Sequence, residues 1–296
     1  MATGVTYREE PCKSALNRAN HRMIGWSLNP YMGCAHRCTF CYVRAFEQVA
    51  GRASGDEYGE SLRIKTNVAE VLRRELARKS WKREPVFIGS ATDPYQPVEG
   101  RYQLTRSCIA ELARARTPVA LITRNPMVVR DIDVLTDAAR HADVTVTFSI
   151  PTLDERIWRL TEPGTPPPAK RLAALTRMID AGINAALGMA PILPGLTDDL
   201  DGMRAVVDAA REAGATSIWA NSLYLKPGTR EHFLEHVARD FPELREEYGR
   251  MYTARPYLPR EQVDAVKRQV GQLAREAGIA DRRTKVIERE EQLTLL

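Results

Sequence analysis

Residues 32–42 read MGCAHRCTFCY and place Cys34, Cys38 and Cys41, three of the chain's five cysteines, within eight residues. Three thiols cannot all pair with one another in disulfides, because one sulfur is always left over, so this spacing favours metal ligation. Three thiolates on one loop can bind three irons of a four-iron cluster and leave the fourth without a protein ligand. The sequence therefore predicts an iron–sulfur cluster with an open coordination position.

Two alternatives to a cluster remain open at this stage. Structural zinc sites and ordinary iron–sulfur carriers use four Cys or His ligands, and no fourth cysteine lies near this loop. His36 could complete a zinc site, but it lies inside the first cysteine interval, where the loop would have to fold sharply back. Three unrelated buried thiols would not account for the clustering. The spacing favours the cluster over both alternatives.

The composition indicates a globular cytoplasmic protein. The chain has 296 residues, enough for one large α/β barrel or two ordinary domains, and 44% are hydrophobic. It has no long uncharged apolar run that could span a membrane, and residues 1–12 lack the apolar centre of a secretory signal. Clustered thiols then predict a reducing cytoplasm. The net charge of +5 is compatible with a nucleic-acid partner but does not require one.

Short apolar runs alternate with amphipathic segments along most of the chain. The expected strands are 24–30, 86–89, 119–122, 144–148, 185–192 and 217–225. Strands separated by helices predict right-handed βαβ units and a parallel sheet. We expect an α/β fold, a partial (β/α)6 TIM-like barrel with a C-terminal helical extension. The cysteines follow the first strand, at the rim where such folds bind ligands.

This pattern divides the chain into three parts. We expect an irregular N-terminal segment at 1–20, the partial barrel at 21–226, and a C-terminal helical region with a charged tail at 227–296. A helix is expected near 260–277, with an apolar stripe that would dock it on the barrel.

The Cys-x3-Cys-x2-Cys spacing, with an aromatic residue before the last cysteine, resembles the signature of the radical S-adenosylmethionine (radical SAM) superfamily. More narrowly, the chain resembles the spore photoproduct lyase-like branch over roughly residues 20–225. The residues that carry this narrower resemblance are Ser90-Ala91-Thr92-Asp93-Pro94-Tyr95, Thr123-Arg124, Ser149, Glu162-Pro163-Gly164-Thr165 and Arg171.

The resemblance implies two cofactors and a set of binding residues. Cys34, Cys38 and Cys41 would bind a 4Fe–4S cluster, whose fourth iron is chelated by the amino and carboxylate groups of S-adenosylmethionine. The other implied positions are Thr92 and Asp93 for the ammonium group, Arg124 and Ser149 for the carboxylate, and Phe40 and Tyr42 beside the adenine or the cluster. An arginine at 124 would allow a bidentate contact.

The resemblance also implies the reaction. The cluster would accept one electron from an external reductant of the flavodoxin or ferredoxin type and cleave S-adenosylmethionine to a 5′-deoxyadenosyl radical, which abstracts hydrogen from a substrate. The branch, the basic pI and the arginines of 250–260, mixed with Tyr252 and Tyr257, favour a nucleic acid or nucleotide. The alternative is a non-catalytic zinc or iron–sulfur module that binds nucleic acid.

The sequence departs from the branch at Ser90. Spore photoproduct lyases have at this position a cysteine that returns a hydrogen atom to the product radical, and a serine O–H bond is too strong for that role. Cys108 lies on the apolar stripe of an expected helix, and Cys12 lies in the N-terminal segment. Repair of thymine photodimers is therefore not expected. With no cysteine after Cys108, a second cluster is not expected either.

Overall fold

The computed structural model describes residues 4–21 and 24–279 and contains a seven-stranded sheet with the strand order β10-β9-β8-β7-β6-β3-β2. Its strands are β2 (Leu16–His21), β3 (Ile24–Leu28), β6 (Val86–Ile88), β7 (Val119–Thr123), β8 (Val144–Ser149), β9 (Asn184–Ile192) and β10 (Ser217–Ser222). Six of them are parallel, and β2 runs antiparallel to β3.

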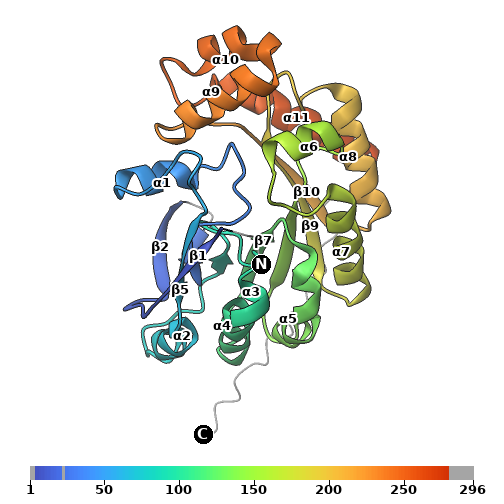
Figure 1. The fold of residues 1–296 in the computed structure, drawn as a ribbon. Coiled ribbons are helices and arrows are strands. Elements are labelled where there is room, and N and C mark those ends of the chain that lie inside the picture. Colours follow the sequence, from blue (N-terminus) through green and yellow to red (C-terminus); the bar gives the residue numbers. More distant parts are fainter. Residues whose placement is uncertain (1–3, 22–23, 280–296) are drawn as a thin grey trace, which may run out of the picture.

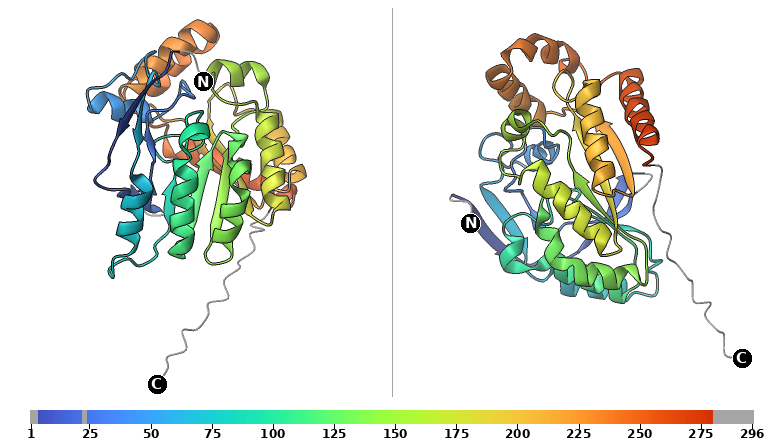
Figure 2. Two further views of the ribbon diagram at one scale, coloured as in Figure 1. Left: turned by 60° about the horizontal axis from the view of Figure 1, so that its bottom comes forward. Right: turned by 90° about the vertical axis from the view of Figure 1, so that its right-hand side faces the viewer.

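The six parallel strands are the six predicted from the apolar runs, so the α/β class is confirmed. Helices α2 (Val68–Leu76), α4 (Leu104–Arg114), α5 (Ile132–Ala139) and α7 (Pro168–Asp180) line one side of the sheet (Figures 1 and 2). α8 (Leu200–Glu212) connects β9 to β10. Within the described residues, β2 and β10 form the two edges, so the sheet is open.

The N-terminal segment is more ordered than its sequence indicates. We expected residues 1–20 to be irregular, but β1 (Thr6–Glu10) pairs with β5 (Ser61–Lys65), and β2 pairs with β3. That prediction was wrong because β1 is mostly exposed and lacks the alternation of a half-buried strand. Its order comes from backbone pairing with a distant segment. On the other side of β5, β4 (Tyr31–Met32) completes a three-stranded sheet and leads directly into the cysteines.

The C-terminal helices cap the end of the sheet where the cysteines lie. α9 (Thr229–Asp240) and α10 (Arg245–Tyr252) lie at the same end of the molecule as α1 (Val43–Val49) and α6 (Glu155–Thr161) (Figure 1). An apolar cluster separate from the main core joins Phe233 and Tyr248 of these helices to Cys38 and Phe40. The predicted helical extension therefore packs on the cysteine loop.

The remaining elements are short, apart from the last helix. α11 (Arg260–Glu276) confirms the predicted C-terminal helix and buries Val270 and Leu273. The others are α3 (Glu99–Tyr102) and the 3-10 helices Pro126–Asp131 and Pro242–Leu244. The predicted charged tail lies mainly beyond residue 279, outside the described residues. Among the helices described, none combines the length and the apolar character needed to cross a membrane.

Candidate active site

The cysteine loop, residues 33–41, connects β4 to α1. Cys34 and Cys38 are buried and Cys41 is half-buried, and all five cysteines of the chain carry free thiols. Burial raises the pKa of the Cys38 and Cys41 thiols. Thiols in such an apolar place become thiolates when a metal or a nearby cation stabilises their charge. The loop therefore has the character of a metal site.

The three thiols alone do not complete a zinc site. A structural zinc ion takes four Cys or His ligands, and the Nδ1 of His36, the candidate for the fourth, lies 3.3 Å from Asp93 Oδ2. Three cysteines on one loop are the number that leaves one iron of a four-iron cluster without a protein ligand.

Thr92 and Gln96, which follow β6, fix the start of the cysteine loop. The Thr92 hydroxyl donates to the Gly33 carbonyl at 2.7 Å, and Gln96 Nε2 donates to Thr92 Oγ1 at 2.7 Å and to the same carbonyl at 3.1 Å. Gln96 Oε1 accepts from the Ala35 N–H at 2.9 Å. Thr92 is thus a positioning residue. The sequence analysis missed Gln96, whose sole signal was its place one helical turn after Thr92.

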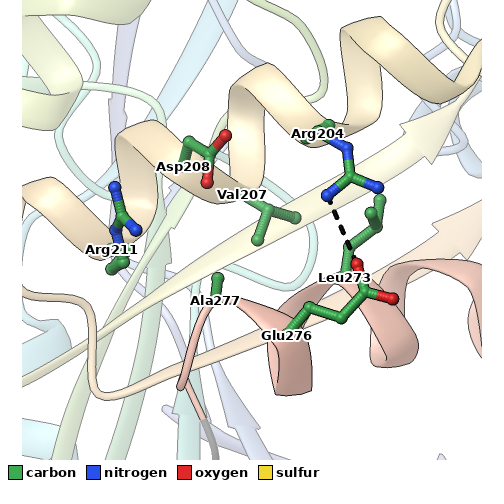
Figure 3. Close-up of a pocket in the computed structure, with 7 residues that line it drawn as sticks. All are labelled: Arg204, Val207, Asp208, Arg211, Leu273, Glu276 and Ala277. Carbon is green, nitrogen blue, oxygen red and sulfur yellow. Dashed lines mark hydrogen bonds and ion pairs between the residues drawn. The ribbon is translucent and has the colours of Figure 1, made fainter.

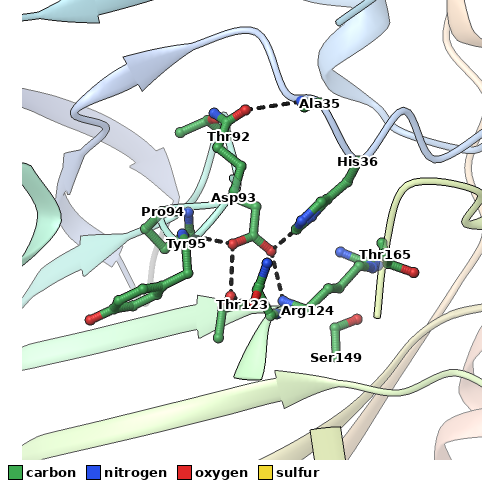
Figure 4. Close-up of polar contacts among 12 residues, drawn as sticks. Ala35, His36, Thr92, Asp93, Pro94, Tyr95, Thr123, Arg124, Ser149 and Thr165 are labelled. Atoms are coloured by element: carbon green, nitrogen blue, oxygen red, sulfur yellow. Dashed lines mark hydrogen bonds and ion pairs between the residues drawn. The ribbon is translucent and has the colours of Figure 1, made fainter. Parts of the chain in front are cut away.

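Asp93 lies at the centre of the strand ends (Figure 4). Its Oδ1 accepts from Thr123 Oγ1 at 2.7 Å and from the Tyr95 N–H at 2.9 Å. Its Oδ2 accepts from the Arg124 N–H at 2.7 Å and lies 3.3 Å from His36 Nδ1. Burial acts to raise the pKa of Asp93, but His36 and these donors lower it to about 2. Three hydrogen-bond donors and the His36 ring thus surround this carboxylate, and its assignment to the ammonium group stays a prediction.

Arg124 belongs to a buried network of three charges. Its Nε lies 3.1 Å from Glu162 Oε1, and Arg171 Nη2 lies 2.5 Å from Glu162 Oε2. Glu162 is 1% exposed and Arg171 is fully buried, whereas the Arg124 side chain is 20% exposed. Burial acts to lower the pKa of Arg124, but Glu162 and Cys38 raise it. Two guanidinium groups on one carboxylate leave a net positive charge, and Arg124 is the member that reaches solvent.

Ser149, at the end of β8, is linked to Arg124 through β9. The Ser149 hydroxyl donates to the Ala190 carbonyl at 2.9 Å, and Arg124 Nη2 donates to the same oxygen at 3.0 Å. Arg171 Nη1 donates to the Ser149 carbonyl at 2.8 Å. The structure thus brings together Arg124 and Ser149, the two residues that the sequence analysis assigned to one carboxylate.

The segment 161–165 packs directly against the cysteine loop. The Gly164 N–H donates to the His36 carbonyl at 3.0 Å, and the Thr39 N–H donates to the Thr161 carbonyl at 2.9 Å. A Cβ added to Gly164 would lie 2.5 Å from the Ala35 carbonyl oxygen and 2.8 Å from His36 Cα. Side chains larger than hydrogen do not fit there without moving the loop, which explains the glycine.

Phe40 and Tyr42 take different places around the loop. Phe40 is buried, and the Arg124 guanidinium carbon lies 5.5 Å from the centre of its ring, in cation–π contact. The Tyr42 hydroxyl donates to the Ser90 carbonyl, which joins the end of the loop to the segment after β6. Phe40 therefore contacts the charged network, whereas Tyr42 is tied by its hydroxyl to the segment after β6.

A row of aromatic rings leads outward from Tyr42. The centre of its ring lies 5.8 Å from that of Tyr224, which is stacked on Tyr257 with the centres 5.4 Å apart. Tyr257 is 52% exposed. Tyr252, the other aromatic residue expected to stack on bases, is fully buried and donates its hydroxyl to the Leu223 carbonyl, so that expectation was wrong.

Ser90 holds the place expected of the hydrogen-donating cysteine. Its hydroxyl accepts from Asn29 Nδ2 at 3.0 Å. Cys108 is fully buried in the main core, and the Cys12 N–H bonds to Asn67, at the start of α2. Within the described residues, the two cysteines outside the loop therefore lie in the core and beside α2, and we assign neither of them the role that Ser90 cannot perform.

A pocket of 220 Å³ lies between α8 and α11, on the outside of the fold (Figure 3). Arg204 and Glu276, an ion pair at 3.3 Å, contribute to its lining together with Val207, Asp208, Arg211, Leu273 and Ala277. It shares no residue with the strand-end cluster. We therefore place the candidate site at the cysteine loop.

Comparison with known proteins agrees with this geometry. The family model described as the radical SAM superfamily matches residues 28–206, a range that contains the three cysteines and the strand-end network. The chain belongs to the radical SAM superfamily. Its cofactors are therefore a 4Fe–4S cluster and S-adenosylmethionine, and the three free thiols on one loop and the positive network at Arg124 fit this pair.

The chain is also similar to individual proteins. The chain is 38% identical over 259 residues to an uncharacterised protein of Mycobacterium tuberculosis, covering 86% of this chain and 76% of the relative. It is 25% identical over 175 residues, 58% of this chain and 34% of the relative, to the radical SAM Nα-GlyT isomerase of Pseudomonas phage M6. A structure of spore photoproduct lyase matches with a TM-score of 0.70 and 10% identity, covering 92% of this chain and 80% of that one. The last likeness shows the fold of the spore photoproduct lyase-like branch.

Proposed function

We propose that this radical SAM enzyme abstracts a hydrogen atom from a nucleic acid or nucleotide. When bound, the reduced cluster and S-adenosylmethionine supply the 5′-deoxyadenosyl radical for this step. An external one-electron donor of the flavodoxin or ferredoxin type would deliver the electron. The observation that carries the substrate class is the exposed ring of Tyr257, which stacks on Tyr224, whose ring in turn contacts that of Tyr42, the neighbour of Cys41.

The cofactor side of this proposal rests on the buried network. Cys34, Cys38 and Cys41 would hold the cluster, and Arg124, the partly exposed member of the network, would bind the carboxylate of S-adenosylmethionine. Ser149 supports Arg124 through the shared Ala190 carbonyl. Phe40 and Tyr42 would form the walls beside the cofactors. Thr92 and Asp93 would orient the loop and Arg124 through the hydrogen bonds they already make.

The substrate side rests on a second cluster, which we call the C-terminal rim: Arg250, Arg255, Tyr257 and Arg260. These side chains are exposed and line a surface hollow of 420 Å³. An exposed ring beside guanidinium groups is an arrangement that binds single-stranded nucleic acid, because bases stack on the ring and phosphates pair with the cations. The rim lies next to Tyr224, which connects it to the cysteine loop.

One structural relative supports the same substrate class. Spore photoproduct lyase complexed with dinucleoside spore photoproduct matches this chain with a TM-score of 0.65 and 14% identity. The complex is a precedent for a nucleotide ligand on this fold. Ser90 removes the thiol expected for that lyase chemistry, so we propose a different reaction on a related class of substrate.

The experiment has two stages. Anaerobic protein, reconstituted with iron and sulfide, is expected to form a 4Fe–4S cluster and to release 5′-deoxyadenosine when S-adenosylmethionine and dithionite are added. Labelled single-stranded DNA and RNA are then expected to bind at low ionic strength, and the bound strand to accelerate 5′-deoxyadenosine release.

The two stages separate the two parts of the proposal. Failure to assemble a four-iron cluster would overturn the cofactor assignment. A competent cluster with no nucleic-acid binding at low ionic strength would leave that assignment standing and reject the substrate class. Stronger acceleration by a mixed peptide library than by any nucleic acid would point away from nucleotides in the same way.

A further inference from the structure

A second group of metal-binding side chains lies outside the cysteine loop. His232 and His236 of α9 and Asp56 of the segment before β5 bring their ligand atoms within 4.8 Å of one another. The two histidines are four residues apart, so they lie on one face of the helix, as in helices that bind zinc through two histidines. The sequence analysis did not note this pair.

Each histidine is arranged as a metal ligand would be. His236 Nδ1 lies 2.9 Å from the His232 carbonyl oxygen, so an N–H there can donate to the backbone and leave Nε2 free to bind. His232 is buried, and its Nδ1 is the ring nitrogen that faces Asp56. A buried imidazole nitrogen that faces a carboxylate at more than hydrogen-bond distance leaves room for an ion between the two groups.

Asp56 supplies the negative charge. Its Oδ1 lies 3.6 Å from His232 Nδ1, too far for a hydrogen bond. Two ligands on a tetrahedral zinc ion, each about 2.0–2.2 Å from the metal, are separated by about 3.4 Å. The observed spacing is therefore suited to two ligands of one ion. Arg44 is a positive charge near His232 and would repel a metal cation bound there. Its guanidinium donates to the carbonyls of Ser54 and Gly55, at 2.8 and 2.6 Å.

We propose that Asp56, His232 and His236 bind one divalent transition-metal ion, with zinc as the best fit. Two imidazoles and one carboxylate form a mixed N/O set that suits zinc, and water would occupy the fourth position. The site is separate from the iron–sulfur cluster and independent of the substrate proposed above.

The position of this site gives the ion a structural task. Asp56 belongs to a segment that packs behind the cysteine loop, where Tyr58 Oη lies 3.7 Å from Cys41 Sγ. On the other side, Thr229 of α9 donates to the Cys41 carbonyl at 3.1 Å. An ion on Asp56, His232 and His236 would join this segment to α9 and so clamp the cysteine loop between them.

The test uses the full chain with its cluster assembled, so that iron already occupies the cysteines. The protein is dialysed without oxygen against micromolar zinc chloride and freed of unbound metal, and its zinc, iron and sulfide are measured. We expect one zinc per chain in addition to the cluster iron.

We expect His236→Gln and Asp56→Asn each to weaken zinc binding at least tenfold in competition with a chelating dye, with iron and sulfide unchanged. His141→Gln, a change at an exposed histidine after α5, should bind zinc as the wild type does.

Asp56→Asn is the decisive variant. Asp56 is 86% exposed, so its replacement by the isosteric amide should leave the fold intact even if His236→Gln does not fold. Zinc should also raise the midpoint of thermal unfolding of the wild type, but not that of Asp56→Asn, because a ligand stabilises only the state that binds it. A wild-type chain that retains no zinc beside its cluster, or an Asp56→Asn chain that retains zinc as tightly as the wild type, overturns the proposal.

Discussion

The buried network on the cofactor side and the C-terminal rim on the substrate side differ in how their polar groups are used. Asp93, Gln96, Glu162 and Arg171 are buried or nearly so, and each bonds to several neighbours. The rim consists of exposed arginines and a ring that is 52% exposed. The cofactors are the same in every turnover, which suits a rigid, fully hydrogen-bonded site. Residues of the exposed rim can be replaced, and the substrate preference changed, with little loss of folding stability. The two sides should therefore respond differently to mutation.

The largest effect is expected at the cysteines. Cys38→Ala removes one of three thiolates and leaves the cluster with two protein ligands, so iron and sulfide after reconstitution should fall to background. Release of 5′-deoxyadenosine should become undetectable by mass spectrometry. Cys12→Ala, a half-buried cysteine near α2, should keep wild-type iron and activity. A Cys38→Ala chain that still incorporates four irons would show that the loop is not the cluster site.

The cysteines were also the part of the site that the sequence predicted best, because ligand spacing on one short loop is a local property. The partners of that loop are not local. Gln96 bonds to Ala35 across 61 positions, and Thr161 accepts from Thr39 across 122 positions. Hydrophobic periodicity does not encode which distant polar groups meet. Asp93 was found by resemblance, but the contacts that its carboxylate makes with distant residues became visible only in the structure.

The next largest effect is expected for stability, at Glu162. Glu162→Gln leaves the fully buried Arg171 without a counter-charge, which should lower the free energy of unfolding by about 3–5 kcal/mol. Chemical denaturation of the cofactor-free chain measures this loss in the free energy of unfolding. Glu155→Gln breaks an exposed pair with Arg159 and should cost less than about 1 kcal/mol. Equal effects of the two changes would remove the distinction between the buried network and the surface.

The same residue gives a pH dependence. Burial acts to raise the pKa of Glu162, but Arg171 and Arg124 lower it overall. The stabilisation is therefore fully present above the ordinary glutamate pKa of about 4.3 and is lost as the pH falls through the lower folded-state value. In Glu162→Gln the free energy of unfolding should depend less on pH in this acidic range than it does in the wild type. An unchanged slope would show that Glu162 does not titrate as an ion pair.

A smaller but more local effect is expected at Gly164. In Gly164→Ala the new methyl group would overlap the Ala35 carbonyl, so the cysteine loop has to shift, at a cost of about 1–3 kcal/mol. Cluster assembly should slow in parallel. Gly55→Ala is the matched control, because nothing lies within 4 Å of its added Cβ. If Gly164→Ala assembles its cluster like Gly55→Ala, the segment 161–165 does not fix the loop.

The fold shows the same division between local and distant information. All six parallel strands were predicted because each is a compact apolar run between polar segments, as in β7 (Val119–Thr123). β1 was missed because its order depends on pairing with β5, more than 50 positions away. At the rim, Tyr252 and Tyr257 are five positions apart, yet one is buried and the other exposed. Composition alone could not distinguish them.

On the rim, the larger effect is expected at Tyr257. Tyr257→Ala removes the exposed stacking surface and should weaken binding of single-stranded DNA or RNA by about 1–3 kcal/mol, measured by fluorescence anisotropy at low ionic strength. Thermal unfolding should change little, unlike at Glu162. Tyr102→Ala on α3, whose hydroxyl bonds to Glu9 of β1, is the aromatic control. Equal losses of affinity in both variants would mean that Tyr257 is not a stacking platform.

The smallest effect is expected at the rim arginines and is seen most clearly in its salt dependence. Arg255 is exposed, so Arg255→Ala should cost little in stability. If it pairs with one phosphate, the slope of log affinity against log salt should become shallower by about 0.7 for a single strand. Arg140→Ala, an exposed arginine after α5, should leave the slope unchanged. An Arg255→Ala slope equal to that of the wild type would mean that the rim does not contact the backbone through Arg255. The proposed nucleic-acid interface would then have to be sought at Tyr257 alone.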